Sequence, residues 1–139
     1  MFDFLGLKKK KAKVSILIVD DEPNIVRTLK DRLEMNEYDV ITGSNGKEGL
    51  DLAVKEQPDI ILLDVIMPLM DGLEMLEALR NNPQCRDIAV IMLTARSQTQ
   101  DIARAKACGI EDYIVKPFDL SELLEKIESI AEHHLAISK

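Results

Sequence analysis

Five short apolar runs alternate with amphipathic segments along this chain, at residues 14–19, 40–42, 60–63, 88–93 and 113–115. Runs of this length are typical of buried strands, and apolar residues repeating every three to four positions between them are typical of helices. Strict alternation of strands and helices predicts a parallel sheet with helices on both faces and right-handed crossovers. The expected fold class is therefore α/β, a doubly wound five-stranded parallel sheet.

Four of the five apolar runs end in chemically active side chains. Asp20 and Asp21 follow the first run, Asp64 the third, Thr94 the fourth and Lys116 the fifth. In an open α/β sheet, sites form in the crevice outside the carboxyl ends of the strands. Three carboxylates, a hydroxyl and an ammonium should therefore converge, and this combination predicts a phosphoryl and Mg²⁺ site.

The order of the strands follows from the same residues. The second strand ends in Gly43 and Ser44, which carry no group suited to this chemistry. An order of 2-1-3-4-5, the flavodoxin-like (βα)5 arrangement, places that strand at the edge and lets Asp21 face Asp64 across the switch point. An order of 3-2-1-4-5 would separate the two carboxylates. We expect the first order.

Helix starts are marked by Pro23, which suits a first helical turn, and by four pairs that have the spacing of capping boxes. The pairs are Asn45 with Glu48, Asp71 with Glu74, Ser97 with Gln100, and Asp119 with Glu122. The fourth helix is the poorest in large apolar side chains, with Ile102 followed by several alanines. Sparse burial means low local stability, so this helix is expected to take part in switching.

Composition limits the classes of partner. The net charge of -7 argues against direct binding of nucleic acid, whose phosphates need clustered Lys and Arg. Cys85 and Cys108 are far apart and suggest neither a disulfide nor a zinc site. No apolar run approaches the ~20 residues that span a bilayer. The chain is expected to be cytoplasmic, without stable membrane insertion.

The two ends of the chain differ from its middle. Residues 1–13 are apolar and then basic, with a net charge of +4 against -11 for the remainder. We expect a flexible tail at 1–13, a single domain at 14–134 and a frayed end at 135–139. A tail that docks on an acidic partner or a membrane surface is the alternative.

Three carboxylates at one place repel one another unless one is protonated or a cation lies between them. Mg²⁺ prefers oxygen ligands, and Asp21 and Asp64 suit direct ligation while Asp20 suits a water-mediated contact. Lys116 and Thr94 can each bind a phosphoryl oxygen while Asp64 attacks in line as the nucleophile.

These segments resemble the receiver domain of two-component response regulators. The resemblance runs from about residue 14 to about residue 132 and rests on four motifs. They are Leu17-Ile18-Val19-Asp20-Asp21-Glu22, Leu63-Asp64-Val65-Ile66-Met67-Pro68-Leu69-Met70-Asp71-Gly72, Leu93-Thr94-Ala95 and Tyr113-Ile114-Val115-Lys116-Pro117-Phe118.

The resemblance implies a role for each site residue. Asp64 would accept a phosphoryl group from the phosphohistidine of a histidine kinase or a phosphotransfer protein. Asp20, Asp21, Asp64 and the backbone carbonyl of Ile66 would hold Mg²⁺, and Lys116 would be the family's lysine, with a cis bond to Pro117.

The same resemblance makes Thr94 and Tyr113 the switch residues, and Ile66 and Arg96 the positions that tune the lifetime of the phosphoryl group. Ile66 is expected to exclude water, and Arg96 to reach over the phosphate. The protein would catalyse only its own phosphorylation and dephosphorylation. It would signal by protein–protein contact through the face made by the fourth helix, fifth strand and fifth helix.

Two alternatives are open to the sequence. A haloacid-dehalogenase-type phosphatase also uses Asp, Thr, Lys and Mg²⁺, but it needs an acid two residues after the nucleophile, where this chain has Ile66. A receiver module of a longer effector is the other. The short segment after the fifth helix favours a stand-alone receiver.

Overall fold

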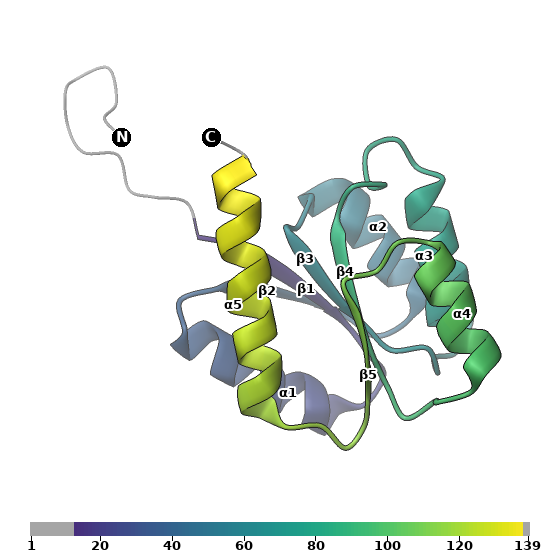
Figure 1. Cartoon of the computed structure of the whole chain (residues 1–139), viewed down its shortest axis with the longest axis horizontal. Helices are drawn as coiled ribbons and strands as arrows, with labels where there is room; N and C mark the ends of the chain where they lie inside the picture. The colour runs from purple at the N-terminus through teal and green to yellow at the C-terminus, as the bar shows by residue number, and fades with distance from the viewer. Residues whose placement is uncertain (1–12, 138–139) are drawn as a thin grey trace.

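The five apolar runs form one parallel sheet in the order β2-β1-β3-β4-β5, which confirms the predicted fold class and order. The computed structural model describes residues 13–137 (Figure 1). Its elements are β1 (Ser15–Val19), α1 (Pro23–Met35), β2 (Asp39–Gly43), α2 (Gly46–Glu56), β3 (Ile60–Leu63), α3 (Gly72–Arg80), β4 (Ala89–Thr94), α4 (Thr99–Ala107), β5 (Asp112–Val115) and α5 (Leu120–Ile137).

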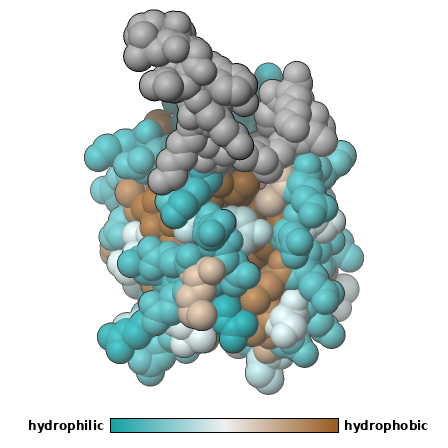
Figure 2. Space-filling view, turned by 90° about the vertical axis from the view of Figure 1, so that its left-hand side faces the viewer, coloured by the Kyte–Doolittle hydropathy of each residue, from teal (hydrophilic) through white to brown (hydrophobic). Residues whose placement is uncertain are grey.

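Helices cover both faces of the sheet, with α1 and α5 on one side and α2, α3 and α4 on the other (Figure 1). Every residue of β3 and β4 is buried, as expected of central strands between two helical layers. Figure 2 shows the molecule from the side of α1 and α5, where apolar surface appears as strips between hydrophilic side chains. Each face of the sheet thus has its own core.

Three of the four predicted capping pairs are supported by hydrogen bonds. Asp71 and Glu74 form a complete capping box at α3, while the side chains of Asn45 and Asp119 accept backbone N–H groups at α2 and α5. The box predicted for Ser97 and Gln100 is wrong. The N-cap of α4 is Gln98, and no side chain caps it. Long-range contacts of the preceding loop, described below, hold this end instead.

The ends of the chain lie partly outside the described residues. The apolar part of the predicted tail falls within residues 1–12, which the structure does not describe. Residues 138–139 also lie outside the described residues. The last helix continues to Ile137, past the predicted domain boundary at residue 134. In the described part of the chain, no helix has the length and apolar character that a membrane crossing requires.

Candidate phosphoryl-transfer site

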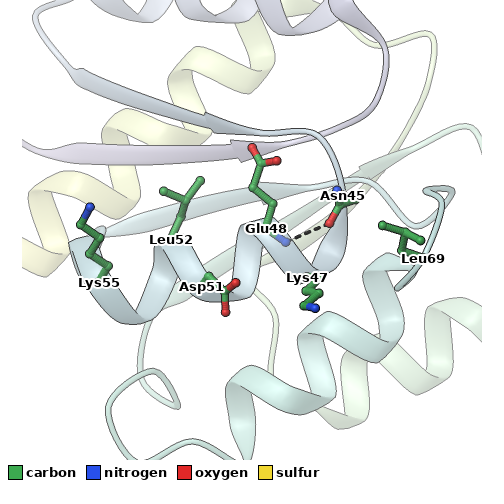
Figure 3. Close-up of a pocket in the computed structure, with 7 residues that line it drawn as sticks. All are labelled: Asn45, Lys47, Glu48, Asp51, Leu52, Lys55 and Leu69. Carbon is green, nitrogen blue, oxygen red and sulfur yellow. Dashed lines mark hydrogen bonds between the residues drawn. The ribbon is translucent and has the colours of Figure 1, made fainter.

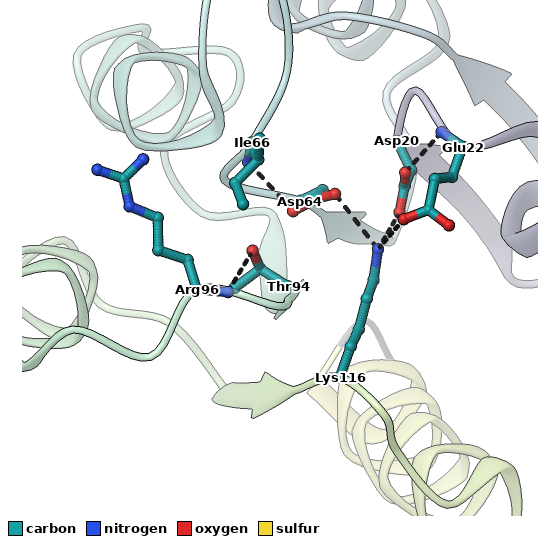
Figure 4. Close-up of polar contacts among 7 residues, drawn as sticks. All are labelled: Asp20, Glu22, Asp64, Ile66, Thr94, Arg96 and Lys116. Carbon is teal, nitrogen blue, oxygen red and sulfur yellow. Dashed lines mark hydrogen bonds and ion pairs between the residues drawn. The ribbon is translucent and has the colours of Figure 1, made fainter.

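The polar residues at the strand ends lie together at the carboxyl edge of the sheet (Figure 4). Asp20 follows β1, Asp64 follows β3, Thr94 ends β4 and Lys116 follows β5. The backbone ladder continues into this edge, since the N–H of Asp64 donates to the carbonyl of Val19 at 3.0 Å. The place of each residue at the end of its strand therefore brings its side chain to this edge of the sheet.

Lys116 lies between the carboxylates. Its Nζ donates to Asp20 Oδ2 at 2.8 Å and to Asp64 Oδ2 at 3.3 Å, and lies 3.8 Å from Glu22 Oε1. The side chains of Asp20 and Asp64 are only 4% and 6% exposed. A buried ammonium thus bridges two buried carboxylates, while Asp21 on the neighbouring position is exposed.

Burial and charge act in opposite directions at this bridge. Burial raises the pKa of Asp20, and this outweighs the hydrogen bonds from Lys116 and from the N–H of Glu22. Burial lowers the pKa of Lys116, but the carboxylates of Asp20 and Asp64 raise it by more, so the net shift is upward. Lys116 therefore remains a cation, and the carboxyl group of Asp20 ionises less readily than one in water.

The loop after Asp64 depends on a close backbone approach at Gly72, the first residue of α3. A Cβ at this position would collide with the carbonyl oxygen of Asp64. The N–H of Gly72 donates to the carbonyl of Val65 at 2.9 Å. The Asp-Gly pair at positions 71 and 72 thus starts the helix and holds the loop that carries Asp64.

Thr94 and Tyr113 both contact the backbone of Arg96. The fully buried Thr94 Oγ1 accepts the N–H of Arg96 at 3.2 Å, and the Tyr113 hydroxyl donates to the carbonyl of Arg96 at 2.6 Å. Burial raises the pKa of Tyr113, and the carboxylate of Asp101 adds to this shift. The two predicted switch residues are therefore connected through one residue of the β4–α4 loop.

Ile66 and Arg96 differ in their relation to Asp64. The N–H of Ile66 donates to Asp64 Oδ1 at 3.1 Å, and the residue is 50% exposed beside the site. The Arg96 side chain points away from Asp64 (Figure 4), and its Nε lies 2.8 Å from Asp101 Oδ2 on α4. The structure thus brings Ile66 to the site and places the Arg96 guanidinium elsewhere.

The carboxylates suit a hard divalent cation. Asp20, Asp21 and Asp64 each offer an oxygen, and these oxygens lie within 4.8 Å of one another. Lys116 supplies one positive charge against three carboxylates, which leaves a net negative charge for a cation to balance. Oxygen ligands of this kind are those that Mg²⁺ prefers.

A separate hollow lies away from this site. It measures about 340 Å³, lies beside α2 and contains the strongly exposed Leu69 of the β3–α3 loop (Figure 3). Its other walls are the side chains of Asn45, Lys47, Glu48, Asp51, Leu52 and Lys55. An open hollow with lysine side chains at its rim brings no reactive groups together, so its size does not make it the functional site.

Comparison with known proteins now decides the family. Residues 16–128 match the family model described as the response regulator receiver domain. The chain belongs to that family. Receiver domains are signalling domains of two-component systems, so phosphorylation-dependent signalling is the general activity of this chain.

Individual relatives agree with this assignment. The chain is 42% identical over 115 residues to the DNA-binding dual master transcriptional regulator RpaA of Synechocystis, covering 83% of this chain and 48% of that protein. It is equally identical over 115 residues to the response regulator ArlR of Staphylococcus aureus, covering 83% and 51%. The receiver domain thus spans about half the length of these curated relatives.

Solved structures show the same fold. A CheY-like response regulator receiver domain protein from Methanospirillum hungatei matches with a TM-score of 0.85 at 30% identity, covering 90% of this chain and 98% of that one. The chemotaxis protein CheY4 of Vibrio cholerae matches with a TM-score of 0.79 at 33% identity, covering 86% and 99%.

Sequence reasoning missed two residues of this receiver domain. Glu22 places a third carboxylate near Lys116, and the Asp20-Asp21-Glu22 run itself was the available signal. Asp101 is buried against Arg96, but an acidic residue in a first helical turn is ordinarily explained by the helix dipole. Only the fold shows that Asp101 faces inward.

Proposed function

We propose that this receiver domain accepts a phosphoryl group on Asp64, with Mg²⁺, from the phosphohistidine of a histidine kinase or a phosphotransfer protein. The supporting observation is the buried Lys116 ammonium within hydrogen-bonding distance of both Asp20 and Asp64. We take residues 14–134 as the receiver unit, working in the cytoplasm and catalysing only its own phosphorylation and dephosphorylation.

Each residue has a role that its place supports. A carboxylate oxygen of Asp64 attacks phosphorus while the P–N bond to the donor histidine breaks. Lys116 and the Thr94 hydroxyl bind two of the three equatorial oxygens, on which charge accumulates. Mg²⁺, held by Asp20, Asp21, Asp64 and the carbonyl of Ile66, would neutralise charge on the phosphoryl group.

Output follows from the contacts of the β4–α4 loop. When the Thr94 hydroxyl binds the phosphoryl group, the N–H of Arg96 either moves with Thr94 or loses its hydrogen bond to it. The Tyr113 hydroxyl, which donates to the carbonyl of Arg96, is then released or redirected. The surface that changes is the face of α4, β5 and α5. This receiver then signals by protein–protein contact through that face, without binding nucleic acid directly.

A receiver module of a longer regulator is a second candidate. It is favoured by the length of the curated relatives, of which the chain spans about half. In that case the same face would contact an output domain in the same polypeptide.

The lifetime of the phosphoryl group is set, in this proposal, by Ile66 and Arg96. Ile66 is branched, lies beside Asp64 and has no side-chain atom that could orient a water. Arg96 carries a guanidinium able to pair with phosphate oxygens. Intrinsic dephosphorylation is expected to be slow, and slower than in a variant that combines Ile66→Asn with Arg96→Glu.

The test is labelling with a small phosphodonor and Mg²⁺. Wild type should gain an acyl phosphate that is stable in acid, labile in base and cleaved by hydroxylamine. Asp64→Asn should abolish the label and Asp21→Ala should weaken Mg²⁺ binding, while Asp51→Asn, on the exposed surface of α2, is the matched control and should label normally. Stoichiometric labelling of Asp64→Asn would refute the assignment.

A further inference from the structure

Asp101 is a buried carboxylate without a part in the proposed phosphoryl transfer. It lies in the first turn of α4, and only 7% of its surface is exposed. A carboxylate taken out of water needs a compensating partner. Among the described residues, the cation within ion-pair distance is Arg96, whose Nε lies 2.8 Å from Asp101 Oδ2.

The contact between Arg96 and Asp101 is electrostatic rather than directional. Within residues 13–137, Asp101 Oδ2 is the buried side-chain oxygen that receives no hydrogen bond of good geometry, although Nε is close. The Arg96 side chain is also 42% exposed, so water weakens the attraction. The ion pair is therefore of modest strength, and a stronger anion can compete with Asp101 for the guanidinium.

The backbone of Arg96 connects this pair to the switch residues. Its N–H donates to Thr94 Oγ1 and its carbonyl accepts the Tyr113 hydroxyl. Its side chain turns toward α4, where it contacts Asp101. One residue thus carries the contact to the phosphorylation site and the contact to the helix expected to move.

We propose that Asp101 is a positioning residue that holds the Arg96 side chain away from Asp64 and thereby shortens the life of the phosphorylated state. This inference rests on the proposed phosphorylation of Asp64. A phosphoryl group brings about -1.5 to -2 charges and three acceptor oxygens, and competes with Asp101 for the guanidinium. A guanidinium pairs with such oxygens through two parallel N–H groups, which the single contact with Asp101 does not match.

The position of Arg96 then decides how easily water reaches the phosphorus. In hydrolysis a water oxygen bonds to phosphorus as the P–O bond to Asp64 breaks, which yields inorganic phosphate and the free carboxylate. Arg96 over the phosphoryl oxygens obstructs that water, whereas Arg96 on Asp101 leaves the path open. Removing the charge of Asp101 should therefore slow hydrolysis.

The experiment is a double-mutant cycle on the full chain. Wild type, Asp101→Asn, Arg96→Ala and the double variant are labelled with a small phosphodonor and Mg²⁺, and the half-life of the acyl phosphate is measured. Asp101→Asn should lengthen the half-life roughly two- to fivefold, the range that one partly exposed ion pair supplies. The lengthening should disappear in the Arg96→Ala background.

A matched control separates this role from a general effect on α4. Glu77→Gln removes the other ion pair of this helix, that with Arg104, which lies on the α3 side. It should leave the half-life unchanged. Denaturation midpoints of all variants show whether folding is affected, and loss of stability alone would not lengthen a half-life.

The outcomes are distinct. An Asp101→Asn half-life equal to or shorter than that of labelled wild type would overturn this inference alone. So would a longer half-life that persists without Arg96, or one reproduced by Glu77→Gln. Wild type that gains no label on Asp64 would overturn the proposed function and this inference with it.

Discussion

The two helices α3 and α4 have the same length and neighbouring positions, yet they are held in different ways. In α3 a complete capping box fixes the start, and Leu73, Met75, Leu76 and Leu79 are buried. In α4 no side chain caps the start, and the buried side chains are those of Asp101 and Ala105. Apolar burial resists displacement, whereas polar contacts can exchange partners.

The polar contacts of α4 come from outside the helix. Arg80, at the end of α3, donates to the carbonyls of Cys108 at 2.7 Å and Gly109 at 2.8 Å. Arg104 pairs with Glu77 of α3, and Arg96 pairs with Asp101. We therefore infer that α3 is a fixed support beside Asp64 and that α4 is the part able to move.

Truncation in the two helices should show the difference most strongly. Leu76→Ala in α3 should lower the free energy of unfolding by about 2–5 kcal/mol, because truncating this fully buried side chain leaves a cavity. Ile102→Ala in α4 should cost only about 1 kcal/mol, since Ile102 is half-buried. Urea unfolding monitored by circular dichroism measures both. Equal losses would contradict the contrast between burial and polar attachment.

Arg80 should be the most important polar support. Besides its two contacts with the α4–β5 segment, its Nη1 donates to the carbonyls of Ile88 at 2.9 Å and Arg86 at 3.1 Å. Arg80→Ala should cost about 2 kcal/mol, because hydrogen bonds from a charged group are lost and partly buried carbonyls remain unpaired.

Arg80→Lys is the informative companion, since it keeps the charge but lacks the planar fork of donors. It should recover only part of the lost stability. Amide exchange should rise at residues 105–112 in both variants. Full recovery by lysine would mean that charge, rather than the geometry of the guanidinium, holds this end of α4.

Phosphorylation should affect the two helices unequally. With a phosphoryl mimic bound, amide exchange around residues 94–118 should change roughly fivefold or more, the size of a typical coupling of about 1 kcal/mol. Residues 72–80 of α3 should change less. A change confined to residues 23–55 would contradict both the proposed output face and the contrast between a fixed α3 and a movable α4.

The sequence was most informative where local and global signals agreed. The strand ends carrying Asp20, Asp64, Thr94 and Lys116 predicted the order of the sheet, because the order 2-1-3-4-5 keeps the groups together whereas 3-2-1-4-5 would separate them. The start of α3 was equally predictable, since Asp71 and Glu74 lie within one turn of each other. Periodicity and short-range pairing need no knowledge of distant contacts.

The start of α4 was not predictable in this way. Its loop is held by Tyr113, which lies 17 residues from Arg96 in the sequence, and by the burial of Asp101. The pattern of Ser97 and Gln100 has the right spacing but no hydrogen bond to satisfy it. Likewise, the length of Arg96 suggested a reach toward Asp64, while a carboxylate on α4 determines where its side chain lies.

The ion pair of Glu77 with Arg104 should give the smallest effect, visible in the pH dependence of stability. The hydrogen bond from Arg104 lowers the pKa of Glu77 from its ordinary value of 4.5. The unfolded chain therefore binds this proton more tightly than the folded one. The stabilisation is fully present above about pH 4.5 and is lost as the pH falls through the lower, folded pKa. Because both side chains are more than 40% exposed, the loss should be smaller than that of any variant above.

Urea midpoints between pH 3 and pH 6 should show a shallower fall for Glu77→Gln than for wild type. Arg104→Gln should have the same effect, and combining the two should add nothing. A profile for Glu77→Gln as steep as that of wild type would show that this pair does not help hold α4 to α3. The attachment of α4 would then rest on Arg80 and on the loop around Arg96.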